Sequence, residues 1–158
     1  MTVGTSWPWR YSDTYKPART LVRILVQVVS RGGNLALNVG PQPDGRLPEE
    51  AIKELSGLGA WLKVNGDAIY GTRAMELPQI DNVMYTKKED IVYAIIPLSE
   101  GEVLGETVLI PTDKSIKKVT CLGYDGEIIF QPSEKGVIVV LPQEIVGTSP
   151  YAITFMLE

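Results

Sequence analysis

The segment RGGNLALNVGPQPDG, at residues 31–45, places the tightest constraint on the fold of this chain. Its centre, residues 34–39, is mostly apolar and lies between a glycine pair and a turn rich in Pro, Gly and Asp. Strands of this kind usually lie inside a parallel sheet that is covered on both faces. Such a strand needs hydrogen-bonding neighbours along its edges. We therefore expect a strand at 34–39 that belongs to an α/β sheet.

Two helices are predicted, one before and one after this strand. The first spans residues 17–30, because Pro17 suits a first helical turn and apolar side chains then recur every three to four positions. The second spans residues 48–64, where Pro48 marks the start and apolar side chains again recur at helical spacing. A helix, a buried strand and a helix in this order are typical of layered α/β proteins and of barrels.

The pattern changes near residue 73. Seven short segments rich in Val, Ile and Tyr follow, and turn residues such as Gly and Asp separate them. This spacing predicts an all-β antiparallel sandwich at residues 74–158, after an α/β part at residues 1–73. A sandwich of this length is expected to fold on its own. The α/β part is not, because one parallel strand with two helices leaves strand edges unpaired.

Charge and hydropathy exclude several classes of function. The net charge is −4, and no basic run is long enough to follow a phosphate backbone, which argues against a nucleic-acid partner. The apolar runs are much shorter than the ~18 residues that a membrane helix needs. The first thirty residues lack the pattern of a signal peptide, so the localisation is left open.

Two residue types restrict the chemistry further. Histidine is absent, so this chain alone cannot assemble a Ser-His-Asp or Cys-His arrangement, or a zinc site with histidine ligands. Cys121 is the only cysteine, which excludes an intramolecular disulfide and a cysteine-rich metal site. Its surroundings, KKVTCLG, predict a strand in which the thiol is buried and unreactive.

Three phrases, in this order, carry a resemblance to a known family. They are MTVGTSWPWRY, LVQVVSRGGNLALNVGPQPDGRLPEE and LGAWLKVNGDAIYGTR. Together they resemble the end of the catalytic barrel of the retaining α-L-fucosidases, glycoside hydrolase family 29. The resemblance covers residues 1–73 and implies that 34–39 is the eighth strand of a TIM-type (β/α)8 barrel, with the last βα units around it. The sandwich would be the C-terminal β-domain of that family.

The resemblance also implies an activity, most of whose residues lie elsewhere. Family members release terminal α-L-fucose through a covalent intermediate on an Asp, and retention requires two carboxyl groups about 5–5.5 Å apart. The nucleophile, the acid/base carboxylate of most members and the histidines of the pocket lie upstream of the matching region. We therefore expect no catalytic residue in this chain, no cofactor, and no activity unless the chain is complemented.

The same reasoning gives expectations about partners. The substrate of the complete enzyme would be a fucosylated glycan. The missing barrel segment would be supplied in trans, by another chain or by another copy of this one, because an uncovered apolar strand invites pairing. The chain could begin at an internal Met or be one piece of a longer enzyme. Family members are commonly secreted, periplasmic or lysosomal, which does not assign a compartment to this chain.

Candidate binding residues lie in the first fifteen positions. From composition alone, the two tryptophans there could either cover a core or line a ligand site. The resemblance places Trp7 where the family has a Trp that packs on the apolar side of fucose, at the carboxyl end of the barrel strands. Trp9 is the second choice, since Pro8-Trp9 replaces the usual Gly. Arg10, Tyr11 and Asn38 are expected at the rim of the pocket or behind it.

The carboxylates and a second function complete the expectations. Asp13 could reach the rim of the pocket, and Asp44 is predicted to sit in a turn before Gly45. The acidic residues of the second helix are expected on a solvated face; they are Glu49, Glu50 and Glu54. As an alternative function, the sandwich could be a carbohydrate-binding or interaction module with an exposed aromatic platform. The competing interpretation is that these aromatic residues fill the core; they are Tyr85, Tyr93, Tyr124 and Phe130.

Overall fold

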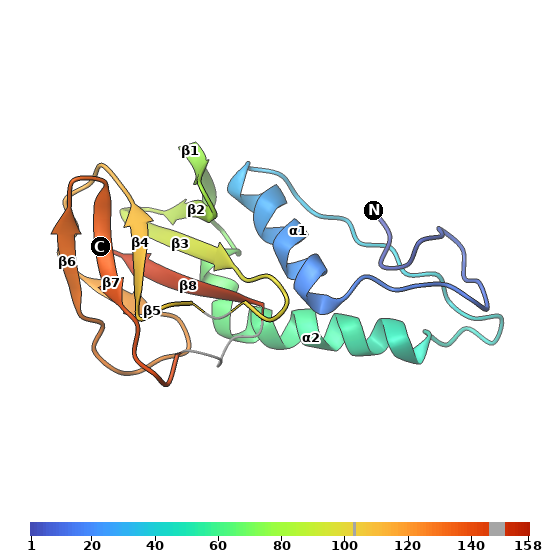
Figure 1. Ribbon diagram of the computed structural model, residues 1–158. Coiled ribbons are helices and arrows are strands. Elements are labelled where there is room, and N and C mark those ends of the chain that lie inside the picture. The colour runs from blue at the N-terminus through green and yellow to red at the C-terminus, as the bar shows by residue number, and fades with distance from the viewer. Residues whose placement is uncertain (103, 146–150) are drawn as a thin grey trace.

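The computed structural model describes residues 1–102, 104–145 and 151–158. Two helices lie beside a β-sandwich, and two long loops extend from the helices away from the sandwich (Figure 1). The helices are α1 (Ala18–Ser30) and α2 (Glu49–Asn65), and a short 3-10 turn, η1 (Gly66–Ala68), follows α2. The strands are β1 (Arg73–Ile80), β2 (Val83–Lys88), β3 (Ile91–Pro97), β4 (Thr107–Pro111), β5 (Val119–Cys121), β6 (Phe130–Ser133), β7 (Gly136–Val140) and β8 (Ala152–Leu157).

Both helices begin one residue later than the sequence predicts, because Pro17 and Pro48 are the caps that precede the first turns. Proline has no N–H to donate, so its place at the start of a helix costs no hydrogen bond. At the other end of α1, the N–H groups of Gly32 and Gly33 donate to the carbonyls of Val29 and Val28, each at 2.9 Å. These two bonds satisfy carbonyls at the end of the helix and turn the chain toward residues 34–39.

The segment 34–39 corrects the prediction of a regular strand. It is extended, but its only bridge among the described residues is a parallel one between Thr2 and Asn38. The Asn38 N–H donates to Met1 O, and the Val3 N–H donates to Asn38 O, each at 2.9 Å. Residues 1–3 thus pair with this segment. A full strand does not form because only one short neighbour lies along one edge of it.

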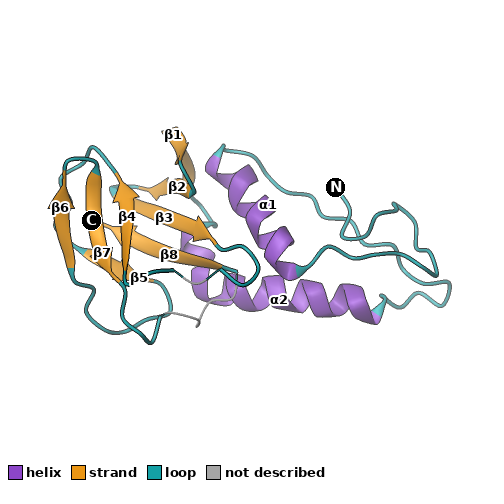
Figure 2. Ribbon diagram, in the orientation of Figure 1, coloured by secondary structure: helices purple, strands orange, loops and turns teal. Residues whose placement is uncertain are grey.

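The second part of the chain is an antiparallel sandwich, as predicted (Figure 2). One sheet has five strands in the order β1-β2-β3-β8-β5, and the other has three in the order β4-β7-β6. The sequence pattern missed β1. Its register shifts between Ala74 and Gln79, so the residues between them, which include Pro78, do not alternate regularly against β2. A helical remnant followed by an all-β sandwich is therefore the fold of this chain.

The five-stranded sheet separates two hydrophobic cores. One core fills the space between the two sheets and contains Phe155, and the other lies between the sheet and the helices and contains Ile95. Neighbouring residues of one strand point to opposite faces. Accordingly, Ala94 joins the first core while Ile95 joins the second. The helices and the sandwich thus share β2, β3 and β8 as a common wall.

Cys121 is buried in β5, as the sequence predicts. Burial disfavours the thiolate and raises the pKa of the thiol to about 12. We expect the folded protein to react with 5,5′-dithiobis(2-nitrobenzoate) at pH 8 far more slowly than the unfolded chain, whose thiol has an ordinary pKa of about 8.5. The absorbance at 412 nm, followed with and without 6 M guanidinium chloride, measures both rates. Equal rates in the two solutions would contradict a buried thiol.

Candidate functional site

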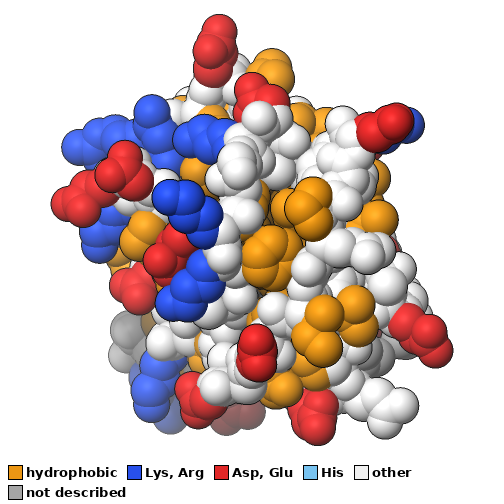
Figure 3. Space-filling view, turned by 90° about the vertical axis from the view of Figure 1, so that its left-hand side faces the viewer, with side chains coloured by type: hydrophobic (Ala, Val, Ile, Leu, Met, Phe, Trp, Pro, Cys, Tyr) orange, Lys and Arg blue, Asp and Glu red, His pale blue; other side chains and the backbone are white. Residues whose placement is uncertain are grey.

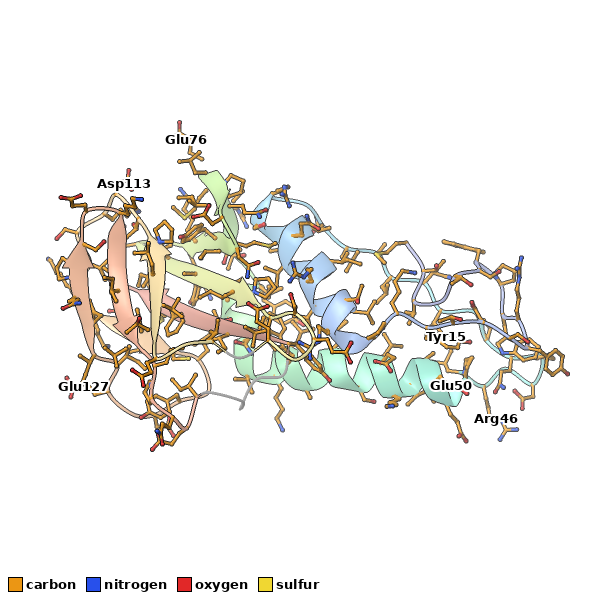
Figure 4. The ribbon with its side chains drawn as sticks, viewed as in Figure 1. Tyr15, Arg46, Glu50, Glu76, Asp113 and Glu127 are labelled. Atoms are coloured by element: carbon orange, nitrogen blue, oxygen red, sulfur yellow. The ribbon has the colours of Figure 1, made fainter. Side chains whose placement is uncertain are left out.

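The candidate site lies where the two parallel segments end. Residues 1–3 and 36–38 run in the same direction, so their carboxyl ends meet at one edge. Residues 4–15, which we name the aromatic loop, follow the first segment, and residues 39–47 follow the second. Figure 4 shows Tyr15, Arg46 and Glu50 at this end of the molecule, away from the sandwich. In (β/α)8 barrels, active sites are built on the loops at the carboxyl ends of the strands.

Asn38 and Gly40 hold the aromatic loop against the end of the second segment. The side-chain amide of Asn38 donates a hydrogen bond of 3.0 Å to the carbonyl of Trp7. A Cβ atom on Gly40 would lie 2.5 Å from the backbone nitrogen of Trp9, which is too close for any side chain. The backbone of Pro8 and Trp9 therefore passes directly over Gly40. Asn38 is engaged with the loop backbone at this point.

The aromatic side chains of the loop differ in their surroundings. The Trp7 side chain is 68% exposed, so it does not cover a core. Trp9 is half-buried and makes an edge-to-face contact with Tyr11, with ring centroids 4.5 Å apart and planes at 61°. Arg10 and Tyr11 are exposed. Trp7 thus presents a free indole face, whereas one side of Trp9 is occupied by Tyr11.

The Asp13 carboxylate closes the aromatic loop on itself. Its Oδ1 accepts 2.9 Å hydrogen bonds from the N–H groups of Thr5 and Thr14, and a further bond from the Thr5 hydroxyl. These bonds, first of all the one from the Thr5 hydroxyl, hold the pKa of Asp13 below its ordinary value of 3.8. Asp13 therefore serves the loop as a hydrogen-bond acceptor, and its position at a pocket rim stays a prediction.

Lys16 fastens the end of the loop to its beginning. Its ammonium group donates to the carbonyls of Thr2 and Gly4, each at 2.9 Å, and its backbone N–H donates to Val3 O at 2.9 Å. The sequence analysis did not single out Lys16 or Thr5. No local pattern marks them, because their partners lie eight or more positions away and are brought close only by the loop.

Two further carboxylates of this region, those of Asp44 and Glu54, also have partners. Asp44 sits in a turn, as predicted, and pairs with Arg46 at 2.6 Å. Glu54 corrects the expectation of a solvated helix face, because its Oε2 accepts a 2.6 Å hydrogen bond from the N–H of Ala18. This bond satisfies one of the free N–H groups at the start of α1. Asp13, Asp44 and Glu54 thus all have partners that define a structural role.

Neither metal clusters nor membrane spans are found in the part of the chain that the structure describes. No group of three or more Cys, Asp or Glu side chains within residues 1–102, 104–145 and 151–158 is arranged to hold a metal ion. Among the same residues, no helix is both long and apolar enough to cross a bilayer.

The aromatic platform suggested for the sandwich does not form. Tyr85 and Tyr93 are buried, and the Tyr85 hydroxyl donates a 2.5 Å hydrogen bond to Pro111 O. Tyr124 and Phe130 pack against the core between the sheets. Figure 3 shows the sandwich end of the molecule, where Lys and Arg side chains gather on the left and exposed apolar side chains lie mainly in the centre and on the right. Two of these side chains are thus buried and the other two are half-buried against a core, so the four do not form an exposed aromatic platform.

The fold and the loop together define a class of protein. Two helices and a short parallel pair of segments, with an aromatic loop at the carboxyl end of that pair, precede an antiparallel sandwich, so the fold is a small helical remnant followed by a β-domain. The family model described as α-L-fucosidase matches residues 1–67. In sequence and in fold, the chain is similar to the C-terminal part of the α-L-fucosidases.

Individual relatives support the same assignment. The α-L-fucosidase of Branchiostoma floridae is 39% identical over 147 residues, which are 87% of this chain and 32% of that protein. Human tissue α-L-fucosidase is 35% identical over 147 residues, or 87% of this chain and 31% of that protein. The crystal structure of the Thermotoga maritima α-fucosidase superposes with a TM-score of 0.86 at 29% identity, over 99% of this chain and 38% of that one. The chain thus spans about a third of the length of the curated relatives it matches.

Proposed function

We propose that this chain forms the last part of the catalytic barrel and the C-terminal β-domain of an enzyme that releases terminal α-L-fucose from glycans with retention of configuration. The observation that carries the proposal is the parallel pairing of residues 1–3 with 36–38, which brings the aromatic loop to the carboxyl end of both segments. The same region matches the α-L-fucosidase family in sequence. Residues 1–73 would be the barrel part and 74–158 the β-domain.

In this proposal the chain contributes binding residues and no catalytic ones. The exposed indole of Trp7 packs on the apolar face of the sugar, and Trp9 is the second contact. Arg10 and Tyr11 stand at the rim, and Asn38 supports Trp7 from behind. The two carboxyl groups that a retaining mechanism needs come from other strands of the barrel. Carboxylate chemistry of this kind uses no cofactor.

The proposal requires a partner for the segment 34–39. The backbone hydrogen bonds of Ala36 and Asn38 run toward residues 1–3. In a parallel ladder the alternate residues, which include Leu37, direct their backbone groups to the opposite edge. No described residue pairs with that edge. The other barrel strands, carried by another polypeptide or by another copy of this one, would cover it.

A chimera tests this function. The present chain replaces the matching 38% of the Thermotoga maritima α-fucosidase chain. We expect the chimera to release 4-nitrophenol from its α-L-fucoside and the 158-residue chain alone to release none. Trp7→Ala in the chimera is expected to lower kcat/KM about tenfold, as the loss of one stacking contact of about 1.4 kcal/mol would do.

The chimera experiment needs a control variant and an outcome that would contradict the proposal. Tyr70→Ala, which removes another exposed aromatic side chain outside the aromatic loop, serves as the matched control and should leave kcat/KM unchanged. A chimera that melts cooperatively but releases no 4-nitrophenol would contradict the proposed function.

A further inference from the structure

The position of the Trp7 indole depends on the backbone that carries it. The side chain is 68% exposed and belongs to neither hydrophobic core. Its backbone carbonyl is bound by Asn38 at the middle of the aromatic loop. Packing of the side chain itself therefore does little to fix its direction, and the two ends of the loop must be held for the indole to stay in one place.

Those two ends are held by one carboxylate and one ammonium group. Asp13 gathers three hydrogen bonds from Thr5 and Thr14 on a single oxygen. Lys16 donates two to the carbonyls of Thr2 and Gly4. Hydrogen bonds with an ionised partner are stronger than neutral ones. We name Asp13 and Lys16 together the loop clasp.

Gly4 provides the space that the clasp needs. Gly4 is buried, and a Cβ atom on it would lie 2.2 Å from Oδ2 of Asp13 and 2.9 Å from Cγ of the same side chain. The carboxylate thus occupies the volume that any larger residue at position 4 would fill. The absence of a side chain at Gly4 thus supports the position of the Asp13 carboxylate, and this observation does not depend on the hydrogen bonds.

We infer that Asp13 and Lys16 are positioning residues that fix the Trp7 indole at the sugar site, although neither reaches the sugar itself. The sugar in this statement rests on the proposed function, whereas the clasp and its effect on Trp7 do not. Asp13→Ala removes all three bonds at once. Asp13→Asn keeps a carbonyl oxygen that can accept from both N–H groups, so it should restore part of the effect.

The clasp is tested on the 158-residue chain by nuclear magnetic resonance. In Asp13→Ala we expect amide hydrogen exchange at Thr5 and Thr14 to accelerate about tenfold or more. The Trp7 indole N–H signal should shift and sharpen, and Asp13→Asn should lie between this variant and the native chain. Trp61 reports whether the variant is folded, because its indole donates to Ala152 O inside the molecule. Unchanged exchange and an unchanged Trp7 signal would overturn the clasp.

Asp125→Ala is the matched control, since it removes one exposed carboxylate from a loop of the sandwich. It should leave Thr5, Thr14 and Trp7 as they are. Lys16→Met tests the other half of the clasp, and it should release Trp7 in the same way while Trp61 stays unchanged. A Trp7 signal that responds equally to Asp125→Ala would show a general charge effect and would refute the specific role of Asp13.

The role at the sugar is tested separately in the chimera. Asp13→Ala should lower kcat/KM about as much as Trp7→Ala, and the double variant should lose no more than either single one, because both remove the same contact. Additive losses would overturn the link from Asp13 to Trp7. If the folded chimera is inactive even without substitutions, the proposed function fails, while the exchange measurements still decide whether the clasp exists.

Discussion

Replacing Phe155 with alanine is expected to lower the free energy of unfolding by about 3–5 kcal/mol. Phe155 lies in the middle of β8 with 0% exposure, and its Cα is paired with those of Ala94 in β3 and Cys121 in β5. Its ring points into the core between the two sheets. Removing it loses apolar burial and leaves a cavity that the paired strands cannot close. Unfolding by urea, followed by circular dichroism, measures the change.

Ile129→Ala is the control for this experiment. Ile129 lies in the same sandwich, but its side chain is 67% exposed. Its truncation should change the free energy of unfolding by no more than about 0.5 kcal/mol. A Phe155→Ala chain that loses less than about 1 kcal/mol would mean that the space between the sheets is not tightly packed around this ring.

Trp61→Ala is expected to have an effect of similar size, about 3–5 kcal/mol, at the other core. Trp61 is on α2 with 4% exposure, and its indole N–H donates a 3.0 Å hydrogen bond to Ala152 O in β8. The side chain therefore joins the helices to the sandwich. Trp61→Phe keeps most of the apolar area but loses that hydrogen bond, so it should cost less. Calorimetry should show a single transition that moves to lower temperature in both variants.

This second experiment also decides between two views of the domain boundary. Ile52→Ala, on the exposed side of the same helix, should have little effect and serves as the control. If the sandwich at 74–158 folds independently, as the sequence suggested, Trp61→Ala should instead split the transition in two, with the sandwich melting at its original temperature. The shared wall of β2, β3 and β8 leads us to expect one transition.

The regular elements could be predicted because their residues repeat with a fixed period. α1 begins directly after Pro17, and α2 begins directly after Pro48 and ends directly before Gly66. β1 was not predicted, because the irregularity between Ala74 and Gln79 interrupts the alternation of its side chains between the two faces of the sheet. The regular strand predicted at 34–39 requires partners on both edges, and periodicity within one segment does not reveal whether they are present.

Some residues of the candidate site could be predicted from the sequence, and others could not. A resemblance in sequence was enough to single out Trp7 and the loop around it. The roles of Asp13, Lys16 and Glu54 were not predictable, because each depends on which backbone groups come within about 3 Å after folding. Composition alone makes such residues indistinguishable from ordinary surface charges.

The position of β8 between two cores limits the changes that this chain can accept. Phe155 faces the other sheet, while Thr154 and Met156 pair with Ile95 and Tyr93, which face the helices. A shift of β8 by one residue would turn Phe155 toward the helices and its smaller or polar neighbours toward the other sheet. A single insertion or deletion in this strand would therefore damage both cores at once. For this reason, we expect insertions and deletions among homologous sequences to be confined to the turns. We also expect substitutions in one hydrophobic core to be accompanied by substitutions in the other, because the two cores share the five-stranded sheet.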